Sequence, residues 1–149
     1  MPQTTTHVNA CDASLWLDNA AGTLVDISGS SNKVSIALTR EVGELRTYQA
    51  HWPVRTGCGK DVEITLTAVY STAADEAKDL LLDWWFATDP GARSFVCYIP
   101  DKNVGSDKFY GEVVIQDVNF DADPTEPAPI AVEVTLLATG EFSRTTTVT

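Results

Sequence analysis

The chain has 149 residues, of which 44% are hydrophobic, so it can form one domain with a packed core and is not disordered by composition. The formal net charge of −11 excludes a protein that binds nucleic acid through a cationic surface, because phosphates are neutralised by clustered Lys and Arg. No apolar run approaches the roughly 20 residues of a membrane-spanning helix, and residues 1–6 lack the features of a secretory signal, so we expect a protein without membrane contact that folds in the cytoplasm.

The N-terminal third of the chain predicts strands separated by turns. Residues 8–17 are typical of a first strand and residues 24–28 of a short second one. The turn between them, residues 19–22, contains Asn and Gly, which tolerate the backbone angles of tight turns. Residues 33–40 then alternate between apolar and polar side chains, which indicates a strand with one buried face. The apolar positions of this strand are Val34, Ile36 and Leu38.

The segment from residue 41 to residue 60 joins two patterned strands but has no apolar periodicity of its own. We therefore predict a long loop, and long loops in compact domains often carry function. The loop has a local excess of positive charge, with three Lys/Arg against two Asp/Glu. Residues 61–149 are strongly acidic by comparison, with five Lys/Arg and sixteen Asp/Glu.

The second half of the chain predicts further strands. Residues 61–69 and 130–138 alternate strictly, as expected for strands with one buried face, and residues 94–99 form a shorter strand. Between residues 109 and 120 the alternation changes phase. A β-bulge near Gln116 would restore the inward face, because one extra residue resets the alternation.

One amphipathic helix is predicted after residue 72. Thr72 is expected to cap its N-terminus with Asp75 in the capping-box position, and Pro90 and Gly91 end it. Apolar side chains recur every three or four residues along one stripe, which predicts packing against the sheet or against a neighbouring subunit. The stripe consists of Ala77, Leu80, Leu81, Trp84 and Trp85.

The residue types that carry catalytic or metal chemistry form no recognisable site. The three cysteines are widely spaced, at positions 11, 58 and 97, which indicates free thiols rather than a disulfide framework or a zinc site. The two histidines have no partners that define a nucleophile. One group of carboxylates could bind Ca²⁺, but the prolines among them indicate a surface connection with solvated side chains. The group consists of Asp117, Asp121, Asp123 and Glu126. We expect no catalytic residue, no metal site and no cofactor.

Residues 24–48 carry a resemblance to a known family. The segment from Asp26 to Gly29 is followed by the alternating strand and then by the segment from Val42 to Tyr48. With the single helix and the strand-rich C-terminal half, this order of elements over residues 8–142 resembles the major tail tube proteins of long-tailed bacteriophages. The resemblance implies a mainly β fold, either a β-sandwich or a partly closed barrel, with one flanking α-helix.

The resemblance also implies a structural role without catalysis. In this family six copies form a ring, and rings stack into a tube around a tape-measure protein, with tail-tip and terminator proteins at its ends. The tube belongs to the virion and later conducts the genome. In this interpretation the polar faces of the predicted strands form an acidic lumen. DNA passes through it transiently and is repelled by its wall. The residues expected on the lumen wall are Asp61, Glu63, Glu112, Gln116 and Glu133.

The 41–60 loop is then expected to reach the next ring of the stack, where its positive charge would meet the acidic surface of another copy. The residues expected to make this inter-ring contact are Arg46, Tyr48, His51, Trp52, Arg55 and Lys60. Residues 1–7 and 143–149 are expected to be flexible tails of a single domain that spans residues 1–149.

Other functions stay open from the sequence. A tail-completion protein, or a tube protein of a secretion or contractile apparatus, would have the same pattern of elements. A β-sandwich carbohydrate-binding module would stay monomeric and present an aromatic platform. Trp and Tyr in strands are otherwise residues of the core or of interfaces. The aromatic residues concerned are Trp16, Tyr48, Trp52, Tyr98 and Tyr110. An enzyme is the least supported alternative.

Overall fold

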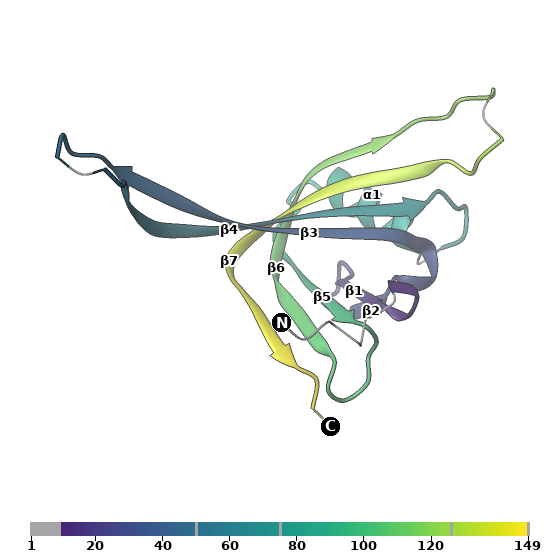
Figure 1. Ribbon diagram of the computed structural model, residues 1–149. Helices are drawn as coiled ribbons and strands as arrows, with labels where there is room; N and C mark the ends of the chain where they lie inside the picture. The colour runs from purple at the N-terminus through teal and green to yellow at the C-terminus, as the bar shows by residue number, and fades with distance from the viewer. Residues whose placement is uncertain (1–9, 50, 75, 126, 149) are drawn as a thin grey trace.

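The computed structural model describes residues 10–49, 51–74, 76–125 and 127–148. The described chain folds into one seven-stranded antiparallel sheet and one α-helix (Figure 1). The strands are β1 (Ser14–Asp18), β2 (Leu24–Asp26), β3 (Ser31–Leu45), β4 (Val54–Val69), β5 (Arg93–Ile99), β6 (Asp107–Phe120) and β7 (Ala131–Thr146). They lie side by side in the order β2-β1-β5-β6-β7-β4-β3. The sheet is not closed, because its outer strands β2 and β3 do not pair with each other, and the prediction of a mainly β fold with one helix is confirmed.

The hydrophobic core lies on one face of this curled sheet. Alternate residues of β4 and β7 point into it, so that Ile64, Leu66, Val134 and Leu136 are completely buried, as their strict alternation predicts. Each such side chain contributes about 1.5–3 kcal/mol relative to full exposure. Leu38 was predicted to be buried with them and is exposed instead, because β7 pairs with β4 only as far as Glu63 and leaves this position uncovered.

The helix α1 (Ala77–Phe86) covers the core and packs against β4 and β6. It begins five residues after Thr72, so the predicted N-cap is wrong, and Asp75 lies outside the described residues. Glu76 occupies the cap position without a side-chain hydrogen bond. The N–H of Ala77 donates instead to the Oγ of Ser30, at 2.9 Å, from the 3-10 helix Ser28–Ser30. The start of α1 is therefore fixed by a tertiary contact.

The apolar stripe of α1 is narrower than predicted. Leu81 and Trp84 are completely buried and Leu80 nearly so, which confirms these three packing residues. Trp85 is 47% exposed, so it does not pack against the sheet, and its packing against a neighbouring subunit stays a prediction. Adjacent residues point about 100° apart on a helix of 3.6 residues per turn, and only one of the two tryptophans can face the sheet.

The segment 41–60 is not a loop throughout. β3 continues to Leu45 and β4 begins at Val54, and the two pair as far as the tip, so only residues 46–53 connect them. The result is a two-stranded ribbon that projects from the body of the sheet (Figure 1). The loop prediction failed because this ribbon has no buried face and therefore lacks the alternation that marks a half-buried strand.

The ends of the patterned region also differ from expectation. The first strand begins at Ser14 rather than residue 8, after the 3-10 helix Ala10–Asp12, and the expected tail over residues 1–7 lies outside the described residues. Of the expected tail over residues 143–149, residues up to Thr146 belong to β7, and Thr146 pairs with Asp107. The bulge predicted in β6 is confirmed, since the register with β7 shifts between Ile115 and Asp117.

Candidate assembly surfaces

The projecting ribbon, residues 40–60, is called the arm below. All of its described residues are exposed except Pro53, which is half-buried. Its strands pair only with each other, since β4 contacts β7 no further along than Glu63. An isolated two-stranded ribbon is marginally stable in water, so an arm of this length implies a surface that covers it.

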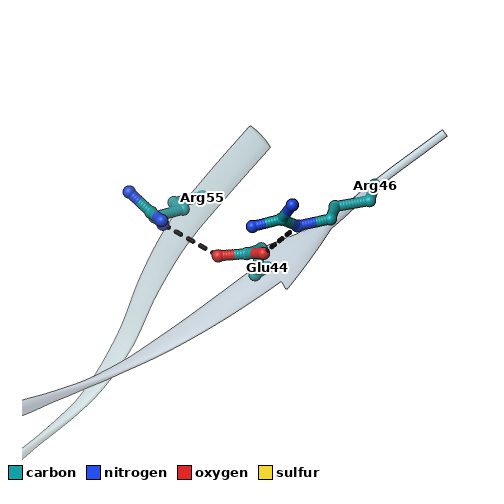
Figure 2. A network of polar contacts seen from close by, with 3 residues as sticks. All are labelled: Glu44, Arg46 and Arg55. Carbon is teal, nitrogen blue, oxygen red and sulfur yellow. Dashed lines mark hydrogen bonds and ion pairs between the residues drawn. The ribbon is translucent and has the colours of Figure 1, made fainter. Parts of the chain in front are cut away.

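One face of the arm is cationic. Residues directly opposite in a pair point to the same face, and this face carries the pairs Arg40–Lys60 and Glu44–Arg55. Arg46 and Arg55 both donate to the carboxylate of Glu44, Arg55 through its Nε at 3.0 Å (Figure 2). Because two guanidinium groups share one carboxylate, the cluster keeps a positive charge after its own ion pairs form.

Toward its tip, the opposite face of the arm is apolar. Leu45 and Val54 pair directly and are 65% and 62% exposed, and Trp52 at the tip is 84% exposed. Tyr48 and His51 are also exposed there. Contiguous apolar surface of this kind marks interaction sites on soluble proteins. The arm therefore brings together the six residues predicted for the inter-ring contact, with Lys60 at its base and the others at or near its tip.

The outward face of β3, β4, β7 and β6 is polar and acidic. Register places Lys33, Thr67, Glu133 and Asn119 in one row across the four strands, and Ser35, Thr65, Thr135 and Asp117 in the next. Asp61 and Glu63 lie on the same face of β4, since they alternate with the buried residues Val62 and Ile64. This surface is called the acidic face below.

Two other predicted lumen residues lie on β6. Glu112 is exposed next to buried Val113 and accepts a hydrogen bond from the Oγ of Ser94 at 2.5 Å. Gln116 is the extra residue of the bulge and is exposed. Because of that bulge, Asp117 turns to the acidic face, where it lies opposite Thr135. The sequence prediction assigned Asp117 to a surface carboxylate cluster and missed this position.

The sheet has two free edges. β3 pairs only with β4, so the other side of this 15-residue strand has no backbone partner among the described residues. At the other end of the sheet β2 pairs, within the part of the chain that the structure describes, with β1 alone. Unpaired N–H and C=O groups along a strand are a template for pairing with another chain, and a long edge strand without such a partner is an aggregation hazard.

Three of the five aromatic residues share one face of β1, β5 and β6: Trp16 and Tyr110 lie in one row across Val96, and Tyr98 is two residues along β5. Trp16 and Tyr98 lie near the same lysine, with the Lys102 Nζ 4.1 Å from the ring centre of Trp16 and 5.9 Å from that of Tyr98. Tyr110 lies 5.0 Å from the Nζ of Lys108. Lysines thus lie near each of these three rings, and the other two aromatic residues, Tyr48 and Trp52, lie on the arm instead.

The cysteines and carboxylates considered as reactive or metal-binding groups form no joint site among the described residues. Cys97 is buried, and burial raises the pKa of its thiol to about 11, so the thiol is neutral at physiological pH. Cys11 and Cys58 are exposed. Within the described ranges no three His, Cys, Asp or Glu side chains are grouped so as to hold a metal ion, and Glu126 lies outside them. Asp123 accepts hydrogen bonds from Thr125, which lower the pKa of its carboxyl group.

The described part of the chain has no helix that is long and apolar enough to cross a membrane.

The fold is shared with parts of phage-like tails. The chain aligns with a protein of the tail of an empty GTA particle with C6 symmetry at a TM-score of 0.71 and 17% identity, covering 92% of this chain and 98% of that one. It aligns with the SPP1 tail tube at a TM-score of 0.71 and 12% identity, covering 94% of this chain and 80% of that one. It aligns with the anti-feeding prophage cap, which terminates the tube, at a TM-score of 0.72 and 10% identity, covering 98% of this chain and 95% of that one.

No protein-family model and no curated protein sequence matches the chain. The agreement over nearly the whole length of the aligned chains shows that this chain has the tail-tube fold.

Proposed function

We propose that this chain is the tube subunit of a phage-like tail, a structural protein that assembles with copies of itself and catalyses no reaction. The observation that carries the proposal is the tail-tube fold of the chain, together with sheet edges that are free among the described residues and an arm whose described residues stay exposed. Unpaired strand edges and an isolated ribbon are unfavourable in a monomer, whereas in a polymer other copies pair with the edges and cover the ribbon.

The ring would form when sheet edges of neighbouring copies meet. The free edge of β3 in one copy would form backbone hydrogen bonds with the free edge of β2 in the next copy. Such a contact joins two different surfaces and can close into a ring. The matched GTA tail has C6 symmetry, and six copies per ring is the corresponding proposal for this chain.

The acidic face would line the lumen of the tube. Carboxylates at Asp61, Glu63, Glu112, Asp117 and Glu133 would repel phosphates, so that DNA passes without adhering. A tape-measure protein would fill the lumen before DNA does, and tail-tip and terminator proteins would close the ends. The virion tail is then the place of function, with assembly in the host cytoplasm.

Shortening the arm tests the proposal directly. Residues 42–58 are replaced by Asn-Gly, which forms a tight hairpin turn and keeps the Arg40–Lys60 pair. We expect the purified wild-type chain to form tubes in negative-stain electron microscopy, and the shortened chain to fold with the same urea midpoint but to form none. A wild-type chain that stays monomeric at every concentration would contradict the proposal.

The lumen assignment has a separate test. Tubes with Glu63→Lys and Glu133→Lys should retain double-stranded DNA at low salt and release it as the salt concentration rises, because phosphate contacts are salt-dependent. Tubes with Glu63→Gln and Glu133→Gln are the matched control and should retain much less. Equal DNA retention by the two double variants would count against an acidic lumen.

A tube-terminating or tail-completion role is the second candidate, because the matched cap has the same fold. A completion protein would form single rings that bind tube ends and would not polymerise alone. The microscopy that tests the main proposal separates the two roles by particle length.

A further inference from the structure

The C-terminal end of α1 is an exposed patch that combines aromatic rings with negative charge. Trp85 and Phe86 are 47% and 75% exposed and contact each other edge to face, with ring centres 5.1 Å apart. Asp83 and Asp89 flank them and are exposed. These four residues are called the helix-end patch below.

The patch is electrostatically unbalanced. The last carbonyls of a helix carry a partial negative charge, which a Lys or Arg in the last turn usually offsets, and α1 has none there. Lys78 and Arg93 both attract the carboxylate of Asp83, but neither forms an ion pair with it within the described residues: Arg93 is buried with its guanidinium 5.0 Å from the ring centre of Trp84, and Lys78 pairs with Asp79. The patch therefore attracts a cation from outside its own subunit.

The arm has the complementary chemistry. Its cationic face offers the guanidinium groups of Arg40, Arg46 and Arg55, which both pair with carboxylates and stack on aromatic rings. Its tip offers the exposed ring of Trp52. The arm projects away from the body of the sheet, which α1 covers (Figure 1), so the tip of the arm extends away from the patch of its own subunit.

We propose that the cationic face of the arm docks on the helix-end patch of a second copy, in the adjacent ring if the chain forms a tube as proposed above. The contact is head-to-tail, because each copy donates one arm and offers one patch, and it therefore propagates along a stack without closing. It gives the inter-ring contact a defined receptor, which the proposed function alone does not.

Another acidic surface lies near the end of β6 and fits less well. Asp121 and Asp123 are close in sequence to exposed Phe120, which packs against Tyr70 with ring centres 6.0 Å apart. The ring of Tyr70 already has a cation, since the Lys78 Nζ lies 5.2 Å from its centre. Asp123 is also engaged by Thr125. Its Tyr70 is 39% exposed and already has a cation near its ring, and its Asp123 is hydrogen-bonded, so this surface serves as the control.

A charge swap tests the docking. Arg55→Glu and Asp83→Arg should each raise the critical concentration for tube formation at least about tenfold, because a charge pair across an interface becomes a repulsion. The two changes together should restore assembly to near the wild-type concentration. Arg55→Glu with Asp121→Arg is the control and should stay defective. Restoration by the Asp121 partner instead, or by neither, would overturn the helix-end receptor.

Cross-linking gives a second readout that does not depend on a loss of assembly. In a chain with Cys11→Ser and Cys58→Ser, the additional changes Arg55→Cys and Asp83→Cys should yield a ladder of disulfide-linked multimers when preformed tubes are oxidised. Arg55→Cys alone should give no ladder. Tubes that form normally but show no ladder would overturn the docking and leave the tube function intact. A wild-type chain without tubes would instead overturn the proposed function, on which this inference rests.

Discussion

The apolar pair on the arm permits a quantitative test of whether the arm is an assembly surface. Leu45 and Val54 face each other across the ribbon and are about two-thirds exposed in the monomer. Changing both to Ser removes apolar surface that the isolated subunit hardly uses. We expect the free energy of unfolding of the monomer to change by no more than about 0.5 kcal/mol, as for other surface substitutions.

Assembly should respond much more strongly. Full burial of a Leu or Val side chain is worth about 1.5–3 kcal/mol, so the exposed two-thirds of each corresponds to roughly 1–2 kcal/mol that only a partner can provide. For the pair this is about 2–4 kcal/mol per arm contact, or roughly 30- to 900-fold in the association constant. Ordering of the arm offsets part of that gain, so the lower end is the expected effect.

The assay is the critical concentration for tube formation, followed by sedimentation and electron microscopy, with urea denaturation of the monomer alongside. Val104→Ser is the matched control, since Val104 is 63% exposed but lies in the connection between β5 and β6, away from the arm. It should leave the critical concentration within about twofold of wild type. An Leu45→Ser, Val54→Ser variant that assembles like the control would refute the arm as an assembly surface.

Three further predictions concern the body of the subunit. Trp84→Ala should lower the free energy of unfolding by about 3–5 kcal/mol in urea titrations, because the ring is completely buried and its Nε1 donates to the backbone carbonyl of Gly91 at 3.1 Å; a loss below about 1 kcal/mol would contradict its place in the core. Ser30→Ala should cost about 1 kcal/mol by leaving the N–H of Ala77 without its acceptor, whereas Ser35→Ala on the exposed face of β3 should be nearly neutral in the same titration. A thiol reagent at pH 8 should modify Cys11 and Cys58 in the native chain and reach Cys97 only in urea, because the Cys97 thiol is buried and stays neutral below a pKa of about 11; modification of all three at one rate would contradict that burial.

The buried strands could be predicted because burial of one face leaves a pattern in the sequence. The alternation over residues 61–69 and 130–138 identified the core positions Ile64 and Val134, and the phase change in residues 109–120 identified the bulge. The acidic side chains on the opposite face followed from the same alternation, as Glu63 and Glu133 confirm by their exposure next to buried neighbours. Whether that face lines a lumen stays a prediction.

The arm could not be predicted as a ribbon because it is paired without being buried. Positions such as Gly43 and Gly57 have no side chain to mark a face, and the exposed strands need no apolar alternation. What the sequence did indicate was the unusual composition of the segment, with positive charge and aromatic residues in an otherwise acidic chain.

The start of α1 and the choice of the buried tryptophan both depend on tertiary contacts, which the local sequence does not show. The start of the helix is fixed by Ser30, which lies 47 residues earlier in the chain and is invisible to a local capping rule. Likewise, local spacing assigned both Trp84 and Trp85 to the packed stripe, and only the position of the sheet determines which of them is buried.

A helical reconstruction of the polymer by electron cryomicroscopy tests the central claim most directly. The account predicts a hollow tube of stacked rings in which Glu63 and Glu133 face the channel and each arm is covered by another copy. A reconstruction with the acidic face on the outer surface, or arms that extend uncovered into solvent, would contradict it.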